Sequence, residues 1–126
     1  MFFSHGSLHS RGVCILLNPS LNCIVKNIHK DQIERIISIY SNFNANNLSL
    51  CNAYVPNGLQ QQQEFIHNLN TNLISNTDVG NLITGGDWNI SLHVIDKMGG
   101  NPWKSTVSRD LLMTMMKEFD FAFSRC

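Results

Sequence analysis

An acid and an amide follow two glycines at the end of a short apolar run, Leu82-Ile83-Thr84-Gly85-Gly86-Asp87-Trp88-Asn89. The apolar run predicts a short buried strand, and the glycines allow backbone or a ligand to approach closely at its end. If extended geometry persists, Asp87 and Asn89 point to one face and Trp88 to the other. A carboxylate can take a proton from water and an amide can donate a hydrogen bond to a phosphoryl oxygen, so the pair suits a phosphate-handling site. A turn after a strand is the alternative interpretation, because Gly, Asp and Asn favour turns.

The composition indicates one small globular domain. The chain has 126 residues, of which 43% are hydrophobic and 14% charged. These fractions are typical of a folded chain with a core rather than of a disordered one. The net charge is zero, which argues against a protein that binds nucleic acid by charge alone but leaves room for a local basic groove.

The cysteines and histidines do not predict a metal centre. No Cys-x-x-Cys pair is present, and Cys14 and Cys51 lie in apolar runs, so we expect reduced thiols that pack as small hydrophobes. His5 and His9 have a metal-compatible spacing but no clear third ligand. No stretch is long enough to span a bilayer and the N-terminus has no signal-like segment. We therefore expect an intracellular protein, nuclear or cytoplasmic, that is not secreted and has no membrane partner; its oligomeric state is not indicated.

Hydrophobic spacing predicts strands in the first half of the chain. They are expected at 13–17, 21–28, 35–42 and 48–55, and residues 1–11 are expected to be loop-like after Phe2 and Phe3. The first two are expected to pair through a turn at 18–20, and the last two through a hairpin loop at 42–47, which gives an antiparallel meander. The last strand alternates, with Ser49, Cys51, Ala53 and Val55 on one face and Leu48, Leu50, Asn52 and Tyr54 on the other.

The spacing becomes helical after Pro56. A helix is expected over 58–75 with Asn57 as its cap, and a second over 108–119 with Ser108 as its cap. Their apolar positions are Leu59, Phe65, Ile66, Leu69 and Leu73 in the first, and Leu111, Leu112, Met115, Met116 and Phe119 in the second. A helix between two strands indicates an α/β crossover. The fold class is therefore α/β (α+β), in a single domain over residues 1–126.

Two motifs, in this order, carry a resemblance to a known family. They are Asn52-Ala53-Tyr54-Val55-Pro56-Asn57, then, after the helix, Gly85-Gly86-Asp87-Trp88-Asn89. This order resembles the middle of the endonuclease/exonuclease/phosphatase superfamily, and most closely the endonuclease domain of LINE-type, non-LTR retrotransposons. Segments 10–16, 92–100 and 111–120 resemble the strand, loop and helix around those motifs, so that the resemblance covers essentially the whole chain.

The resemblance implies a fold and an activity. The fold is a four-layered α/β sandwich, of mixed but mostly antiparallel sheets with flanking helices, and the activity is Mg²⁺-dependent hydrolysis of a phosphodiester in DNA. Asp87 would orient and deprotonate the attacking water, Asn89 would contact the phosphate, and Tyr54 would hydrogen-bond near the scissile bond. Asn57 and Asn52 would belong to the substrate-binding part of the site, where Asn57 would brace the site and Asn52 would support the residues that touch the substrate. A metal that neutralises the phosphate while a fixed carboxylate prepares water is coherent chemistry.

The chain also departs from the family pattern. The family's first metal site needs an Asn and a Glu before the strand at 13–17, and its domain closes with an Asp and a Ser-Asp-His segment. The glutamates and histidines lie outside those contexts: Glu34, Glu64, Glu118, His5, His9, His29, His67 and His93. No residue is therefore assigned as a metal ligand, and we expect Mg²⁺ to bind very weakly.

These departures predict a partial domain that lacks its N-terminal and C-terminal parts and leaves sheet edges open. Three interpretations follow. The chain is a fragment of a retrotransposon endonuclease that is inactive alone, a phosphodiesterase whose missing ligands come from elsewhere, or a non-catalytic interaction module that retains the fold.

Overall fold

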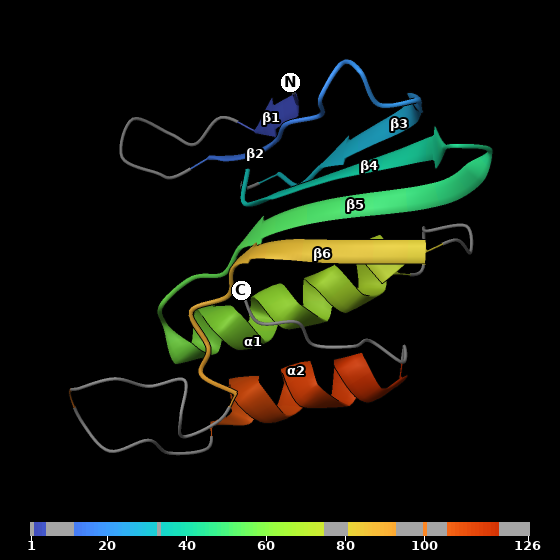
Figure 1. Ribbon diagram of the computed structural model, residues 1–126. Coiled ribbons are helices and arrows are strands. Elements are labelled where there is room, and N and C mark those ends of the chain that lie inside the picture. Colours follow the sequence, from blue (N-terminus) through green and yellow to red (C-terminus); the bar gives the residue numbers. More distant parts are fainter. Residues whose placement is uncertain are drawn as a thin grey trace.

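The computed structural model describes residues 2–4, 12–32, 34–74, 81–92, 100 and 106–118. Its elements, in chain order (Figure 1), are β1 (Phe2–Ser4), β2 (Val13–Ile15), β3 (Cys23–Lys30), β4 (Ile36–Phe43), β5 (Asn46–Tyr54), α1 (Leu59–Asn68), the π-helical turn η1 (Leu69–Ile74), β6 (Asn81–Asp87) and α2 (Val107–Glu118). The molecule is α+β, with a four-stranded mixed sheet and two α-helices, which agrees with the predicted class. None of the described helices combines the length and apolar character needed to cross a bilayer.

The larger sheet has the strand order β3-β4-β5-β6. Strands β3, β4 and β5 form an antiparallel meander, in which the β4–β5 hairpin is the predicted one, and β6 pairs with β5 in parallel. A parallel neighbour requires a crossover connection, and α1 with η1 lies in it. The β4–β5 hairpin turns at Asn44 and Ala45, whose φ angles are 48° and 65°. Two successive positive φ angles match the twist of the strands, so that the loop is shorter than the predicted 42–47.

Two strand predictions were wrong. Strand β2 does not pair with β3 through the 18–20 turn; it pairs with β1 in a separate two-stranded sheet. Residues 2–4, for which no strand was predicted, supply that partner. The strand that ends at Asp87 is not buried: β6 pairs only with β5 among the described strands, and Ile83 is 57% exposed. An apolar run of this length has the same composition at an edge as in the centre of a sheet, since only the neighbouring strands decide its burial.

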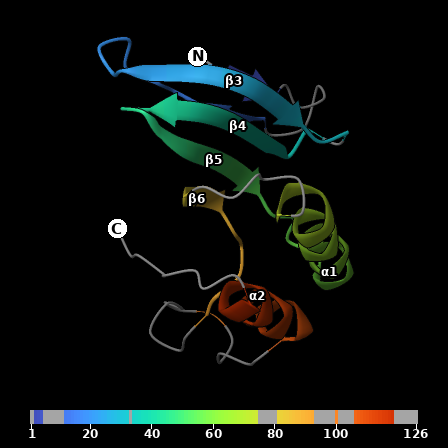
Figure 2. The same cartoon turned by 90° about the vertical axis from the view of Figure 1, so that its right-hand side faces the viewer.

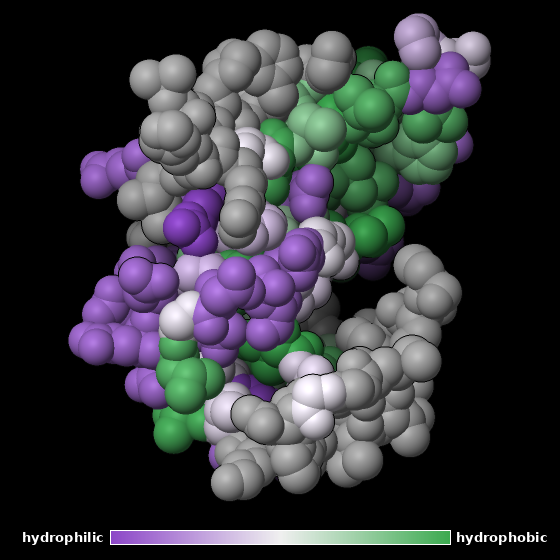
Figure 3. All heavy atoms as spheres, turned by 90° about the vertical axis from the view of Figure 1, so that its left-hand side faces the viewer, coloured by the Kyte–Doolittle hydropathy of each residue, from purple (hydrophilic) through white to green (hydrophobic). Residues whose placement is uncertain are grey.

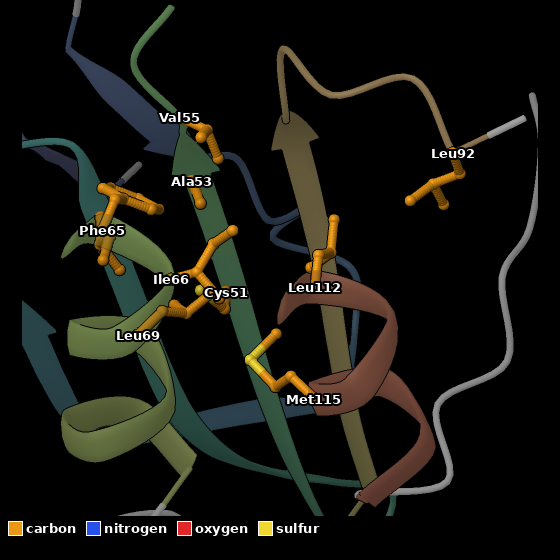
Figure 4. Packing of buried hydrophobic residues seen from close by; sticks show 10 residues of the cluster. Cys51, Ala53, Val55, Phe65, Ile66, Leu69, Leu92, Leu112 and Met115 are labelled. Carbon is orange, nitrogen blue, oxygen red and sulfur yellow. The ribbon is translucent and has the colours of Figure 1, made fainter. Parts of the chain in front are cut away.

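The main core lies between the sheet and the helices. Cys51, Ala53 and Val55 project from β5 onto this face, as the alternation predicted, and are buried. Figure 4 shows them opposite Phe65, Ile66 and Leu69 of α1 and η1 and Leu112 and Met115 of α2. Figure 2 shows both helices next to β5 and β6 and β3 at the far end of the sheet. The helices therefore cover β5 and β6, the two strands whose ends carry the two motifs.

The opposite face of the sheet carries Ile37 and Ile39, which are also fully buried. They pair with Asn52 and Leu50, and cross-strand partners share a face. Strand β2 contacts β4 and β5 on this side, and the Asn52 amide Nδ2 donates to the Cys14 carbonyl at 2.7 Å. The described layers are therefore helices, the four-stranded sheet and the small β1–β2 sheet.

The helix ends differ from the predictions. Gly58, not Asn57, is the N-cap of α1, and it makes no side-chain cap bond. In α2 the hydroxyl of Thr106 accepts from the Arg109 amide at 3.1 Å, which is the capping bond predicted for Ser108. Ser108 lies inside the first turn, fully buried, and its hydroxyl donates to the Leu59 carbonyl at 3.2 Å. It therefore joins the two helices instead of capping one.

Most described members of the predicted helix stripes belong to the core or pack against it: Phe65, Ile66, Leu69, Leu112, Met115 and Met116. Leu59 and Leu111 are 57% and 40% exposed, because the sheet and the partner helix cover a narrower strip of each helix than the sequence spacing predicted. Phe119 lies outside the described residues, as does the side chain of Leu73.

At Gly86 the backbone of β6 approaches that of β5 closely. Its φ is +133°, and a Cβ atom there would lie 1.9 Å from the carbonyl oxygen of Ala53. Only glycine satisfies both the conformation and the space. Its neighbour Gly85 has nothing within 4 Å of the corresponding Cβ position, so that the second glycine of the pair carries the constraint.

We predict that Gly86→Ala lowers the free energy of unfolding by at least about 3 kcal/mol, from backbone strain and the clash with Ala53. Gly85→Ala is the matched control and should change it by less than about 1 kcal/mol. Urea unfolding followed by circular dichroism measures both. Equal losses in the two variants would contradict the close approach at Gly86.

Three cysteines are described, and all are free. Cys51 is buried, whereas Cys14, predicted as a small core hydrophobe, is exposed. Desolvation by burial, with a smaller contribution from the charge of Asp31, raises the pKa of the Cys51 thiol from 9.0 to about 12. Cys126 lies outside the described residues.

At pH 8 iodoacetamide should therefore alkylate Cys14 in the folded protein and leave Cys51 unmodified until the chain is unfolded, because the thiolate is the nucleophile. The folded state also keeps the Cys51 proton where the unfolded chain releases it, so that stability should fall as pH rises from about 9 towards 12. Peptide mapping by mass spectrometry gives the labelling order. Rapid labelling of Cys51 in the folded protein would contradict its burial.

Candidate functional site

Three polar side chains form a row across the ends of adjacent strands. Tyr54, the last residue of β5, pairs with Asp87, the last residue of β6. On the other side, the Tyr54 amide donates to the carbonyl of Arg35, just before β4, at 2.8 Å. The Val55 amide donates to the Asp87 carbonyl at 2.8 Å. We call Arg35, Tyr54 and Asp87 the strand-end row.

The strand-end row lies on the sheet face away from the helices. Tyr54 alternates with the core residues Ala53 and Val55, and shares its face with Asn52, which reaches the β1–β2 sheet. The parallel register places Asp87 on that same face. Figure 3 looks onto the side of the molecule where β5 and β6 end and shows hydrophilic residues gathered across its middle. The structure thus brings together three of the predicted site residues, Asn52, Tyr54 and Asp87.

Arg35 was not predicted as a site residue. Its guanidinium carbon lies over the Tyr54 ring, 5.6 Å from the centroid, within the range of a cation–π interaction. The side chain is half-buried. Its only sequence signal is a place at the start of a predicted strand. This position identifies Arg35 as a neighbour of Tyr54 only once the register between β4 and β5 is known.

Asn89 does not project beside Asp87 as the sequence predicted. The strand ends at Asp87, and Asn89 has φ 50°, which turns its side chain away from the strand alternation. The amide Nδ2 donates to the Val55 carbonyl at 2.7 Å, and the Asn89 backbone amide donates to Asp87 Oδ1 at 3.1 Å. Asn89 therefore fastens the end of β6 to the end of β5 and orients the Asp87 carboxylate. Trp88 packs against the core cluster on the helix side.

A further residue that the sequence did not single out supports this fastening. Gln62 of α1 is buried, and its Nε2 donates to the Asn89 carbonyl at 3.1 Å. The signal available in the sequence was a run of four glutamines without any indication of which one faces inward. Asn57 is exposed between β5 and α1, and none of the described hydrogen bonds joins it to the strand-end row.

The donors of the strand-end row do not fit a magnesium site by themselves. The row contains one carboxylate, the exposed Asp87, and no described group of three His, Cys, Asp or Glu side chains could hold a metal. Asp31 is not part of the row, and its Oδ1 accepts from the Ile36 amide at 2.7 Å. His5, His9 and His93 lie outside the described residues.

The row can nevertheless perform two chemical tasks. The Asp87 carboxylate is exposed and held by the Asn89 amide, a suitable arrangement for accepting a proton from water. The guanidinium of Arg35 supplies donors on the same face, beside the Tyr54 ring, which favours an anionic ligand. A simple turn after a strand does not require a cation, a phenol and a carboxylate in one line. This combination therefore favours a binding site over the turn interpretation.

Asn89→Ala should lower the free energy of unfolding by about 1–2 kcal/mol, because the Val55 carbonyl loses its donor and alanine must adopt a positive φ. Asn89→Gly removes the same amide but tolerates that φ, so its loss should be smaller. Comparison of the urea midpoints of wild type, Asn89→Ala and Asn89→Gly separates the loss of the hydrogen bond from the strain of the positive φ. Wild-type stability in both variants would show that Asn89 does not fasten the strands.

The sequence matches no protein-family model and no curated protein. The features that bear on function are the strand-end row, the fastening by Asn89 and Gln62, and the order of the two motifs that produce them.

Proposed function

We propose that this chain is the central part of a DNA endonuclease domain of the endonuclease/exonuclease/phosphatase type, most similar to that of LINE-type retrotransposons. The observation that carries the proposal is the pairing of Tyr54 with Asp87. The two motifs are separated by a whole helix in the sequence, yet their polar residues end on adjacent strands and on one face. A phosphodiester of the DNA backbone is the substrate that the motifs imply.

In this proposal Asp87 accepts the proton of the attacking water, and its orientation comes from the Asn89 amide. The Tyr54 hydroxyl donates to a phosphate oxygen from the adjacent strand. Asn52 acts indirectly, because its amide is bound to the Cys14 carbonyl and fixes the small sheet beside the row. Asn89 is a positioning residue rather than a phosphate ligand.

The magnesium ion implied by the family would supply charge neutralisation at the phosphate. Since the row provides a single carboxylate, we propose that further ligands come from outside the strand-end row and that the chain alone does not hydrolyse DNA. The helix, sheet and small-sheet layers support a partial version of the four-layered sandwich. A DNA substrate favours a nuclear or cytoplasmic protein.

A second candidate function is a non-catalytic interaction module. The observation that favours it is the internal use of the Asn89 amide, which leaves fewer groups to contact a phosphate. Such a module would unfold cooperatively and would bind a partner. It would not hydrolyse DNA, even when the chain is extended on both sides. A non-cooperative melt would exclude it.

Nicking of supercoiled plasmid in the presence of Mg²⁺ tests the main proposal. The chain extended by the residues that its transcript encodes on both sides should nick, and Asp87→Asn should lower the rate by about 10²–10⁴-fold, as expected on loss of a general base. The 126-residue chain alone should not exceed its own Asp87→Asn variant. Undiminished nicking by the extended Asp87→Asn protein would contradict the assigned chemistry.

A further inference from the structure

Arg35 is a cation without a carboxylate partner in the part of the chain that the structure describes. The ion pair found there joins Arg109 to Asp110, and the described contact of the Arg35 guanidinium is with the Tyr54 ring. A half-buried guanidinium is costly to hold away from water unless its donors are used. None of the described hydrogen bonds uses the guanidinium N–H groups of Arg35, so that among the described residues these donors remain for a ligand.

The spacing of the strand-end row fits an anion between its two ends. Adjacent strands lie about 4.8 Å apart, so the backbone positions of Arg35 and Asp87 are separated by about 10 Å with Tyr54 between them. A phosphate bound at the Arg35 end faces a bidentate donor and the phenol. At the other end the Asp87 carboxylate is far enough away to leave room for a water molecule.

We propose that Arg35 binds the phosphate of the substrate and sets which end of the row it occupies. This assignment rests on the proposed function for the identity of the phosphate as a DNA phosphodiester. Arginine suits this position because its planar fork matches two phosphate oxygens while its face rests on an aromatic ring.

The same sheet offers a matched control. Lys26 of β3 lies over the Tyr40 ring, with its Nζ 5.8 Å from the centroid. Tyr40 pairs with Ser49, so it belongs to the face opposite the strand-end row. Lys26→Gln and Arg35→Gln therefore remove the same charge from the same kind of contact, but only Arg35→Gln removes it from the row.

Binding of a fluorescein-labelled 12-base-pair DNA duplex to the full chain, followed by anisotropy in EDTA, tests the assignment without hydrolysis. Arg35→Gln should weaken binding at low salt at least fivefold and reduce the slope of log K against log salt by about 0.9, the value for one lost phosphate contact. Lys26→Gln should stay within twofold of wild type. Inorganic phosphate should compete with the duplex for wild type and less for Arg35→Gln.

Two further variants serve as controls for this binding experiment. Arg35→Lys keeps the charge but not the fork, so the salt slope should remain while affinity falls; it also replaces Arg35→Gln if thermal melting shows that variant to be unfolded. Asp87→Asn should strengthen binding a few-fold, because a negative charge beside the phosphate is removed.

Absence of duplex binding by the wild-type chain, unchanged binding by Arg35→Gln, or equal losses in Arg35→Gln and Lys26→Gln would each overturn the assignment. The proposed function fails separately. If the extended chain does not nick but Arg35→Gln selectively loses binding, the phosphate site stands and the hydrolytic role falls. If nicking depends on Asp87 but binding is independent of Arg35, only the role of Arg35 falls.

Discussion

The parallel pairing of β5 and β6, continued to the last residue of each strand, is the constraint on which the rest of the structure depends. It brings β6 so close to β5 that a side chain at Gly86 would overlap the Ala53 carbonyl. The register that follows sets Tyr54 beside Asp87. A slip of one residue would move Asp87 to the helix face, into the apolar core, where a carboxylate would have to be neutralised or paired.

The core and the candidate site are coupled at this strand end. Gln62 belongs to the buried side of α1, yet its amide binds the carbonyl of Asn89, and the Asn89 amide binds the carbonyl of Val55. Packing of α1 on β5 therefore determines where the chain leaves β6. The Asp87 carboxylate takes its orientation from the same turn through the Asn89 backbone amide, so that apolar packing on one face of the sheet fixes polar geometry on the other.

The two faces of β5 make different contacts. One face supplies Cys51, Ala53 and Val55 to the core, and the other supplies Asn52 to the contact with β2 and Tyr54 to the strand-end row. The exposed Ile83 on β6 and the exposed residues of β3 lie towards the ends of this sheet. Sheet edges of this kind are where a protein pairs with further strands.

The sequence by itself determined the elements whose cause is local. Alternation along residues 48–55 and helical spacing after Pro56 predicted β5, α1 and the crossover, because each pattern is a property of neighbouring residues. The two motifs also identified Tyr54 and Asp87 as candidate site residues. Only the tertiary structure decided that β2 pairs with β1, that β6 is the last of the described strands in its sheet and that Thr106 caps α2. Pairing partners lie far apart in the chain, and composition does not encode which strand is adjacent. The positive φ of Asn89 and the place of Arg35 over Tyr54 were decided there too, since both depend on a register that exists only once the sheet has formed.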